Sequence, residues 1–158
     1  MYNFFMLQIK EVNLYRLNIP LKKSFITAQG SIKEKDVLLL KLIDCSGIVM
    51  WSECSAQNNI NYHPETVQLA HDCLVDTLIP FITTQSIKHP SDVIKMLDNE
   101  IDGNYFAKAA IEMGCWAIEA KQNKLSLANY LQGTNSHIDS GIVIPIQQDS
   151  ELTLKMVR

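Results

Sequence analysis

The first third of the chain alternates apolar and polar side chains in the manner of β-strands. Across residues 7–17 the apolar positions lie about two residues apart, which predicts a strand with one buried face. Because Pro20 has no backbone N–H to donate to a sheet, we expect it to end this strand and residues 22–36 to form a polar loop. Two more strands, joined by a tight turn, are expected at residues 37–43 and 48–54, giving an antiparallel meander.

The middle of the chain changes to the spacing of amphipathic helices. Apolar residues recur at intervals of three and four, which predicts helices over residues 64–78, 90–101, 105–122 and 126–131. Pro64 suits a first helical turn, and we expect Glu65 to complement the dipole of the same helix. Lys108 and Glu112 lie four residues apart and are expected to pair along the third helix. Strands followed by helices indicate an α+β domain.

After residue 134 the pattern changes again. The β-branched run at 138–146 predicts a strand buried on both faces, and a new helical pattern begins at Asp149. A strand followed by the first turns of a helix is the start of a βα unit, which cannot bury its own apolar faces. We therefore expect residues 1–134 to form one domain and residues 135–158 to begin another.

Composition and charge narrow the class of protein. The chain has 158 residues, of which 47% are apolar and 20% charged, as in ordinary globular proteins. Its net charge of −3 argues against nucleic acid or an anionic membrane as the main partner. No apolar run approaches the roughly 18 residues of a spanning helix, and the start lacks the features of a signal peptide. We expect a cytoplasmic protein, in which the four cysteines are free, buried thiols.

Sequence motifs of the common catalytic centres are missing. The chain contains no GxGxxG, GxxxxGK[ST], HExxH or GxSxG pattern, and its cysteines lack the spacing of a structural zinc site. His63 and His89 each precede a proline at an expected helix start, so we expect them to have capping or loop roles. The residues by themselves predict no catalytic centre and no metal site.

Several segments together carry a family pattern. They are IPLK at 19–22, KDVLLL at 35–40, WSEC at 51–54, YHPET at 62–66, GN at 103–104, AKAAIEM at 107–113 with Trp116, and SLA at 126–128 with Leu131 and Gly133. In this order they resemble the start of the enolase superfamily, and most of all its branch of o-succinylbenzoate synthases and N-acylamino acid racemases. Ser52, Gly114 and Ala117 depart from the glycine, alanine and aspartate that are usual in this branch.

The resemblance implies a specific architecture. Enolase superfamily enzymes have an N-terminal α+β capping domain, a three-stranded meander with a helical bundle, over a (β/α)8 barrel. Residues 141–147 fall on the first barrel strand, although Val143 and Pro145 depart from the serine and glycine that are usual there. The chain is therefore expected to hold the capping domain and the first βα element of an otherwise missing barrel, as a truncated member of the superfamily.

The resemblance also implies where the chemistry lies. In the family, two lysines and three Mg²⁺-binding carboxylates lie on later barrel strands, and the metal stabilises an enediolate. Mg²⁺ is thus implied for the complete enzyme, and no catalytic or metal-binding residue is assigned to this chain. The capping domain selects the substrate through two loops, here about 23–31 and 54–63. The matching substrate-binding positions are Phe25, Gln29, Gln57 and Tyr62.

Each of these four residues has an alternative role. Phe25 could instead anchor its loop in the core, and Tyr62 could be a hydrophobic staple that precedes a helix. Gln29 and Gln57 could be ordinary polar loop residues, because related racemases tend to carry apolar residues at these positions.

The activity that the resemblance implies is that of an o-succinylbenzoate synthase. Such an enzyme eliminates water from a cyclohexadiene carboxylate in menaquinone biosynthesis. A small carboxylate would be the substrate, the complete enzyme would be a homo-oligomer, and this chain alone would be inactive. An N-acylamino acid racemase of the same branch is the first alternative. A non-catalytic remnant or binding module is the second.

Overall fold

The structure is a computed structural model that describes residues 6–28, 30–147 and 149–157. The chain divides into two compact units. Unit 1 consists of Met1–Leu17 and Asp36–Gly133, and unit 2 of Asn18–Lys35 and Thr134–Arg158. Residues 18–35 thus group with the C-terminal segment, and the domain boundary after residue 134 stays a prediction.

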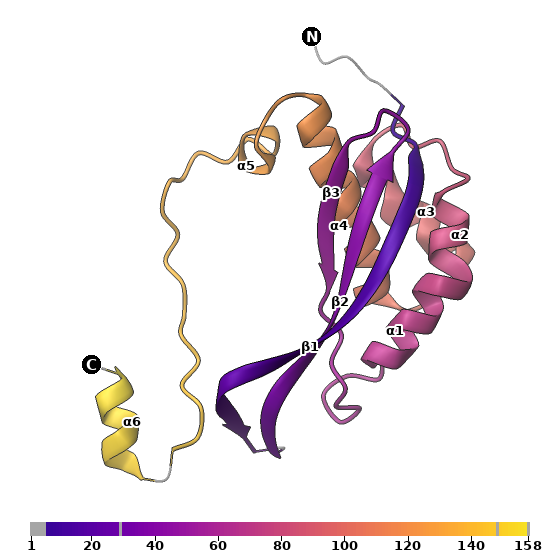
Figure 1. Cartoon of the computed structure of the whole chain (residues 1–158). Coiled ribbons are helices and arrows are strands. Elements are labelled where there is room, and N and C mark those ends of the chain that lie inside the picture. The colour runs from indigo at the N-terminus through magenta and orange to yellow at the C-terminus, as the bar shows by residue number, and fades with distance from the viewer. Residues whose placement is uncertain (1–5, 29, 148, 158) are drawn as a thin grey trace. The chain divides into compact units, whose positions relative to one another are not determined.

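A three-stranded sheet begins the fold, as predicted (Figure 1). Its strands are β1 (Ile9–Thr27), β2 (Gly30–Asp44) and β3 (Val49–Cys54), in the order β1-β2-β3. Strands β2 and β3 are antiparallel, with Leu38 opposite Cys54 and Ile43 opposite Val49. The carboxylate of Asp44 closes the turn between them by accepting hydrogen bonds from the backbone N–H groups of Ser46 and Ile48, at 2.9 and 2.8 Å. The predicted meander is confirmed.

Strand β1 continues through Pro20, so the predicted strand end and polar loop were wrong. At one end of the β1–β2 ladder Cys45 N donates to the Gln8 carbonyl, and at the other the Thr27 hydroxyl donates to the Gly30 carbonyl. Strand β1 has 19 residues and β2 has 15. A sheet tolerates proline in an edge strand and at bulges, and β1 is an edge strand.

The helices of unit 1 follow the predicted order. They are α1 (Val67–Cys73), the π-helical turn η1 (Leu74–Leu78), α2 (Ile79–Ile82), the 3-10 turn η2 (Pro90–Asp92), α3 (Val93–Glu100), α4 (Tyr105–Gln122) and α5 (Leu127–Tyr130). Helix α1 begins after the predicted Pro64, because the Thr66 hydroxyl caps it by accepting the Leu69 N–H at 3.3 Å. The predicted limits of α4 match the structure.

The core of unit 1 lies between the sheet and the helices, with α4 packed against β3 (Figure 1). From β2 it takes the fully buried Leu38, Leu40 and Leu42, and from α4 alanine and isoleucine side chains. Gly114 of α4 faces Leu42, where an added Cβ would lie 2.5 Å from Leu42 Cδ1. Glycine therefore lets the helix backbone approach the sheet closely.

Unit 2 contains the far end of the β1–β2 hairpin, residues 134–147 without helix or strand, and α6 (Ser150–Val157). The helix expected from Asp149 is confirmed. The strand expected at 138–146 was wrong: the Ile138 side chain is 84% exposed, and Ile146 N donates to the Ile26 carbonyl at 3.1 Å. A strand buried on both faces needs a paired neighbour on each side, and the described residues do not supply them.

Candidate functional site

Helix α4 begins without a capping side chain of its own. Its first residue follows Asn104, which has a left-handed backbone (φ 53°) and makes no side-chain cap. The carboxylate of Glu65 takes this role: its two oxygens accept the backbone N–H groups of Phe106 and Ala107, each at 2.9 Å. Glu65 is only 6% exposed, so its charge is stabilised by the helix N-terminus. The predicted role of Glu65, in its own helix, was wrong.

Lys108, in the first turns of α4, links this helix to α3. Its side chain is 1% exposed, and Nζ contacts Asp98 Oδ1 of α3 at 2.7 Å and also donates to the Ile101 carbonyl. The predicted pair with Glu112 was wrong, because Glu112 accepts a hydrogen bond from Trp116 Nε1 at 3.1 Å. Lys108 therefore joins the end of α3 to the start of α4.

Residues 55–66, here called the 55–66 loop, connect β3 to α1 and carry two of the predicted substrate-binding residues. Gln57 and Tyr62 are both exposed, Tyr62 by 61%. Asn59 orders the loop: its side-chain oxygen accepts Asn61 N–H at 3.0 Å, and its carbonyl accepts Tyr62 N–H at 2.9 Å. An exposed Tyr62 does not pack as a hydrophobic staple, so this alternative finds no support in the structure.

His63 closes the end of the same loop. Its Nδ1 accepts the Glu65 N–H at 3.1 Å, and its ring packs edge-on against Phe106 with the ring centroids 4.8 Å apart. His89 likewise accepts the Ser91 N–H at 3.2 Å. The predicted capping or loop roles are confirmed, since His89 caps η2 and His63 accepts a backbone N–H within the loop.

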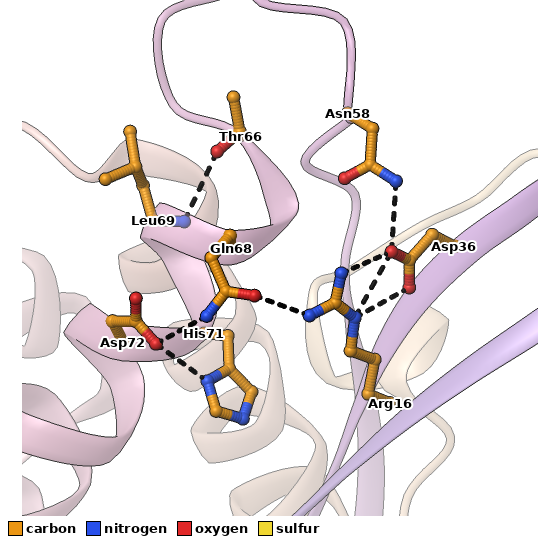
Figure 2. Close-up of polar contacts among 8 residues, drawn as sticks. All are labelled: Arg16, Asp36, Asn58, Thr66, Gln68, Leu69, His71 and Asp72. Carbon is orange, nitrogen blue, oxygen red and sulfur yellow. Dashed lines mark hydrogen bonds and ion pairs between the residues drawn. The ribbon is translucent and has the colours of Figure 1, made fainter.

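An ion pair between β1 and β2 anchors the 55–66 loop to the sheet (Figure 2). Arg16 Nη2 lies 2.7 Å from Asp36 Oδ2, and Arg16 Nε donates to both carboxylate oxygens at 3.1 and 3.2 Å. Asn58 of the loop donates to the same Oδ2 at 3.0 Å. The sequence reasoning missed these three residues, because pairing positions 16 and 36 requires the strand register.

The same ion pair reaches helix α1 through Gln68 (Figure 2). Arg16 Nη1 donates to Gln68 Oε1 at 2.6 Å, and Gln68 Nε2 donates to Asp72 Oδ1 at 2.8 Å. His71 Nδ1 lies 3.1 Å from that Asp72 oxygen. Two strands, one loop and one helix therefore share a single polar network.

The Arg16–Asp36 ion pair shifts the pKa values of both partners. Hydrogen bonds from the Arg16 guanidinium, with a smaller contribution from Asn58, hold the pKa of Asp36 below its ordinary value, although partial burial opposes the shift. The pKa of Arg16 is raised by the same hydrogen bond. The Asp36 side chain is 15% exposed and that of Arg16 is 40% exposed, so solvent screens the pair on one side.

The end of the β1–β2 hairpin, residues 18–35, carries Phe25. Phe25 is half-buried. Gln29 lies outside the described residues.

Four lysines of the hairpin are exposed, Lys22, Lys23, Lys33 and Lys35. With Glu34 they give residues 18–35 a net charge of +3. The other residues carry −6, so the whole chain has a net charge of −3. The predicted site residues thus lie in two units, Phe25 in unit 2 and both Gln57 and Tyr62 in unit 1.

The described residues do not fit a Mg²⁺ site. Within the described ranges no three His, Cys, Asp or Glu side chains gather as they would around a metal ion.

Three cysteines are buried and free as predicted, but Cys45 is exposed. Burial raises the pKa of Cys54 to about 11 and that of Cys115 to about 12, so neither is a reactive thiolate near neutral pH. In the part of the chain that the structure describes, no helix is both long and apolar enough to cross a membrane.

Comparison with known proteins extends the picture. Residues 9–132 match the family model for the N-terminal domain of mandelate racemase / muconate lactonizing enzyme. The o-succinylbenzoate synthase of Bacillus subtilis is 35% identical over 139 residues, which are 88% of this chain and 37% of that protein. The N-succinylamino acid racemase of Thermus thermophilus is 28% identical over 96% of this chain and 40% of its own.

A solved structure agrees with these matches. A member of the enolase superfamily from Listeria innocua superposes with a TM-score of 0.87 at 32% identity, over 96% of this chain and 40% of its own. The chain therefore spans about 40% of the length of the relatives that it matches.

The Arg16–Asp36 pair generates a prediction about pH. We expect a ¹³C NMR titration of the Asp36 carboxyl group to give a midpoint below 3.8, its ordinary value. Since the folded-state pKa is lowered, the pair stabilises the fold above about pH 3.8, and this stabilisation is lost as the pH falls through the folded-state value. Arg16→Gln should raise the midpoint, whereas the matched control Lys10→Gln, on the same strand, should leave it unchanged. A midpoint at or above 3.8 in the unaltered chain would contradict the prediction.

Proposed function

The chain belongs to the mandelate racemase / muconate lactonizing enzyme family, as an N-terminal domain of the enolase superfamily, and we propose that it is part of an o-succinylbenzoate synthase. The observation that carries the proposal is the 35% identity to the Bacillus subtilis synthase along 88% of the chain. The proposed reaction is the Mg²⁺-dependent elimination of water from a cyclohexadiene carboxylate through an enediolate. We place it in cytoplasmic menaquinone biosynthesis.

Within this enzyme we assign the chain to substrate selection. The 55–66 loop presents Gln57 and Tyr62 to solvent from a base fixed by Glu65, His63 and Asn58. Exposed side chains on a fixed base suit a loop that closes over a bound substrate and excludes water. Phe25 and Gln29 of the hairpin are the other proposed substrate contacts. The general acid, the general base and the Mg²⁺ ligands are assigned to residues outside this chain.

The charge of the hairpin supports an anionic substrate. Residues 18–35 carry +3 in a chain whose other residues sum to −6. A local positive field attracts a small carboxylate and raises its rate of association, and this effect weakens as salt increases. The proposed cyclohexadiene carboxylate has the required sign of charge.

An N-acylamino acid racemase is the second candidate. The Thermus thermophilus relative favours it, because the match covers 96% of this chain, although its identity of 28% is lower. A racemase would use the same enediolate but would return the proton to either face of the carbon. A non-catalytic binding module remains the third hypothesis.

The proposal is tested by joining residues 1–134 to two different barrels. In one chimera they replace the matching segment of the Bacillus subtilis synthase, and in the other that of the Thermus thermophilus racemase. With Mg²⁺ present, we expect the first to dehydrate its substrate within about tenfold of the parent kcat/KM and the second to lose more than about tenfold of its racemase kcat/KM. The opposite order would favour the racemase, and two folded but inactive chimeras would favour the binding module.

Phe25 can be tested in the synthase chimera. If Phe25 contacts the substrate, Phe25→Ala should raise KM about tenfold while kcat changes little, because the lost contact is remote from the reacting carbon. Phe25→Leu keeps much of the apolar volume, so its KM should lie between those of the unaltered chimera and Phe25→Ala. A lower melting temperature with unchanged kinetics of the folded enzyme would show instead that Phe25 is a core anchor.

A further inference from the structure

Arg16 and Asp36 lie where the chain leaves and re-enters unit 1. The first segment of the unit ends at Leu17 and its second segment begins at Asp36, so the whole of residues 18–35 lies between the two partners of one ion pair. We call this pair the Arg16–Asp36 clasp. Its position makes it a side-chain contact across the base of the hairpin that carries Phe25.

The clasp has the geometry of a strong and directional contact. Two guanidinium nitrogens of Arg16 face both oxygens of Asp36, with the shortest distance 2.7 Å between Nη2 and Oδ2. Such bidentate pairing restricts orientation as well as distance, which a single-point lysine contact does not. The two backbones are thereby fixed at one point.

The clasp also holds the 55–66 loop. Asp36 Oδ2 accepts hydrogen bonds from Arg16 and from Asn58 of the loop, at 2.7 and 3.0 Å (Figure 2). Arg16 in turn donates to Gln68, the second residue of the helix that follows the loop. Loss of the Asp36 carboxylate would thus release the base of the hairpin and the loop anchor in a single step.

We propose that Arg16 and Asp36 are positioning residues that set the conformation of both substrate-selecting segments, the 18–35 hairpin and the 55–66 loop. Neither residue needs to touch the substrate, because each acts through the segments that it holds. The assignment to substrate selection rests on the proposed function, whereas the mechanical coupling of the two segments does not. The sequence separates these segments by about 20 residues. The two partners of the clasp flank the hairpin in the sequence, and Asn58 of the loop donates to the Asp36 carboxylate.

Amide hydrogen exchange by NMR on the 158-residue chain tests the coupling without any substrate. The loop reporters are the Asn61 and Tyr62 amides, which bond to Asn59, and the hairpin reporters are the protected amides of residues 18–28 and 30–35. Arg16→Gln and Asp36→Ala should each speed exchange about fivefold in both segments, as expected for the loss of one partly exposed ion pair. Amides of Ile111 and Cys115 in α4 should not change. Lys10→Gln and Glu11→Gln, on the same strand, are the charge-matched controls and should have no effect on either segment.

The exchanged pair Arg16→Asp with Asp36→Arg separates coupling from simple stabilisation. It can re-form the ion pair at the base of the hairpin, and the added substitution Asn58→Leu removes the amide whose oxygen could otherwise accept from the relocated guanidinium. We therefore expect hairpin protection to return while the loop reporters stay fast. Faster exchange in the hairpin alone after Asp36→Ala, or an equal increase in α4, would overturn the proposal. Failure here would leave the proposed function standing, and failure of both chimeras would leave the clasp standing.

Discussion

The buried carboxylate of Glu65 is the interaction on which the arrangement of unit 1 depends. A carboxylate that is 6% exposed loses most of its hydration, and burial without partners would cost several kcal/mol. The start of α4 supplies those partners, two backbone N–H groups at 2.9 Å together with the positive end of the helix dipole. Each side thereby satisfies the other, and the end of the 55–66 loop is fixed to the longest helix of the chain.

The position of α4 then sets what the rest of the unit can present. The helix packs on the sheet where Gly114 meets Leu42, and Lys108 fastens its first turns to α3. With these supports inside the unit, Gln57 and Tyr62 can remain exposed on a loop whose ends do not move freely. The described residues thus provide a scaffold and exposed contact residues, and they provide no metal-binding cluster. These features agree with the proposal that this domain selects the substrate while another part of the enzyme performs the chemistry.

Local patterns predicted the elements that local physics determines. The spacing of small and apolar residues gave the limits of α4, and turn chemistry located the Asp44 hairpin. The failures have a common cause, since each depends on a partner distant in sequence. Pro20 is tolerated because β1 is an edge strand, and the 138–146 run forms no strand because it lacks paired neighbours among the described residues. Glu65 and the Arg16–Asp36 clasp act across 41 and 20 residues, beyond the reach of any periodicity.

Hydrogen exchange at Phe106 and Ala107 tests the role of Glu65 most directly. Amides in the first turn of a helix have no acceptor within the helix and ordinarily exchange quickly. If the Glu65 carboxylate caps α4, both amides should exchange at least about tenfold more slowly than unprotected amides and recover fast exchange in Glu65→Ala. Fast exchange at both positions in the unaltered chain, while the interior of α4 stays protected, would contradict the account.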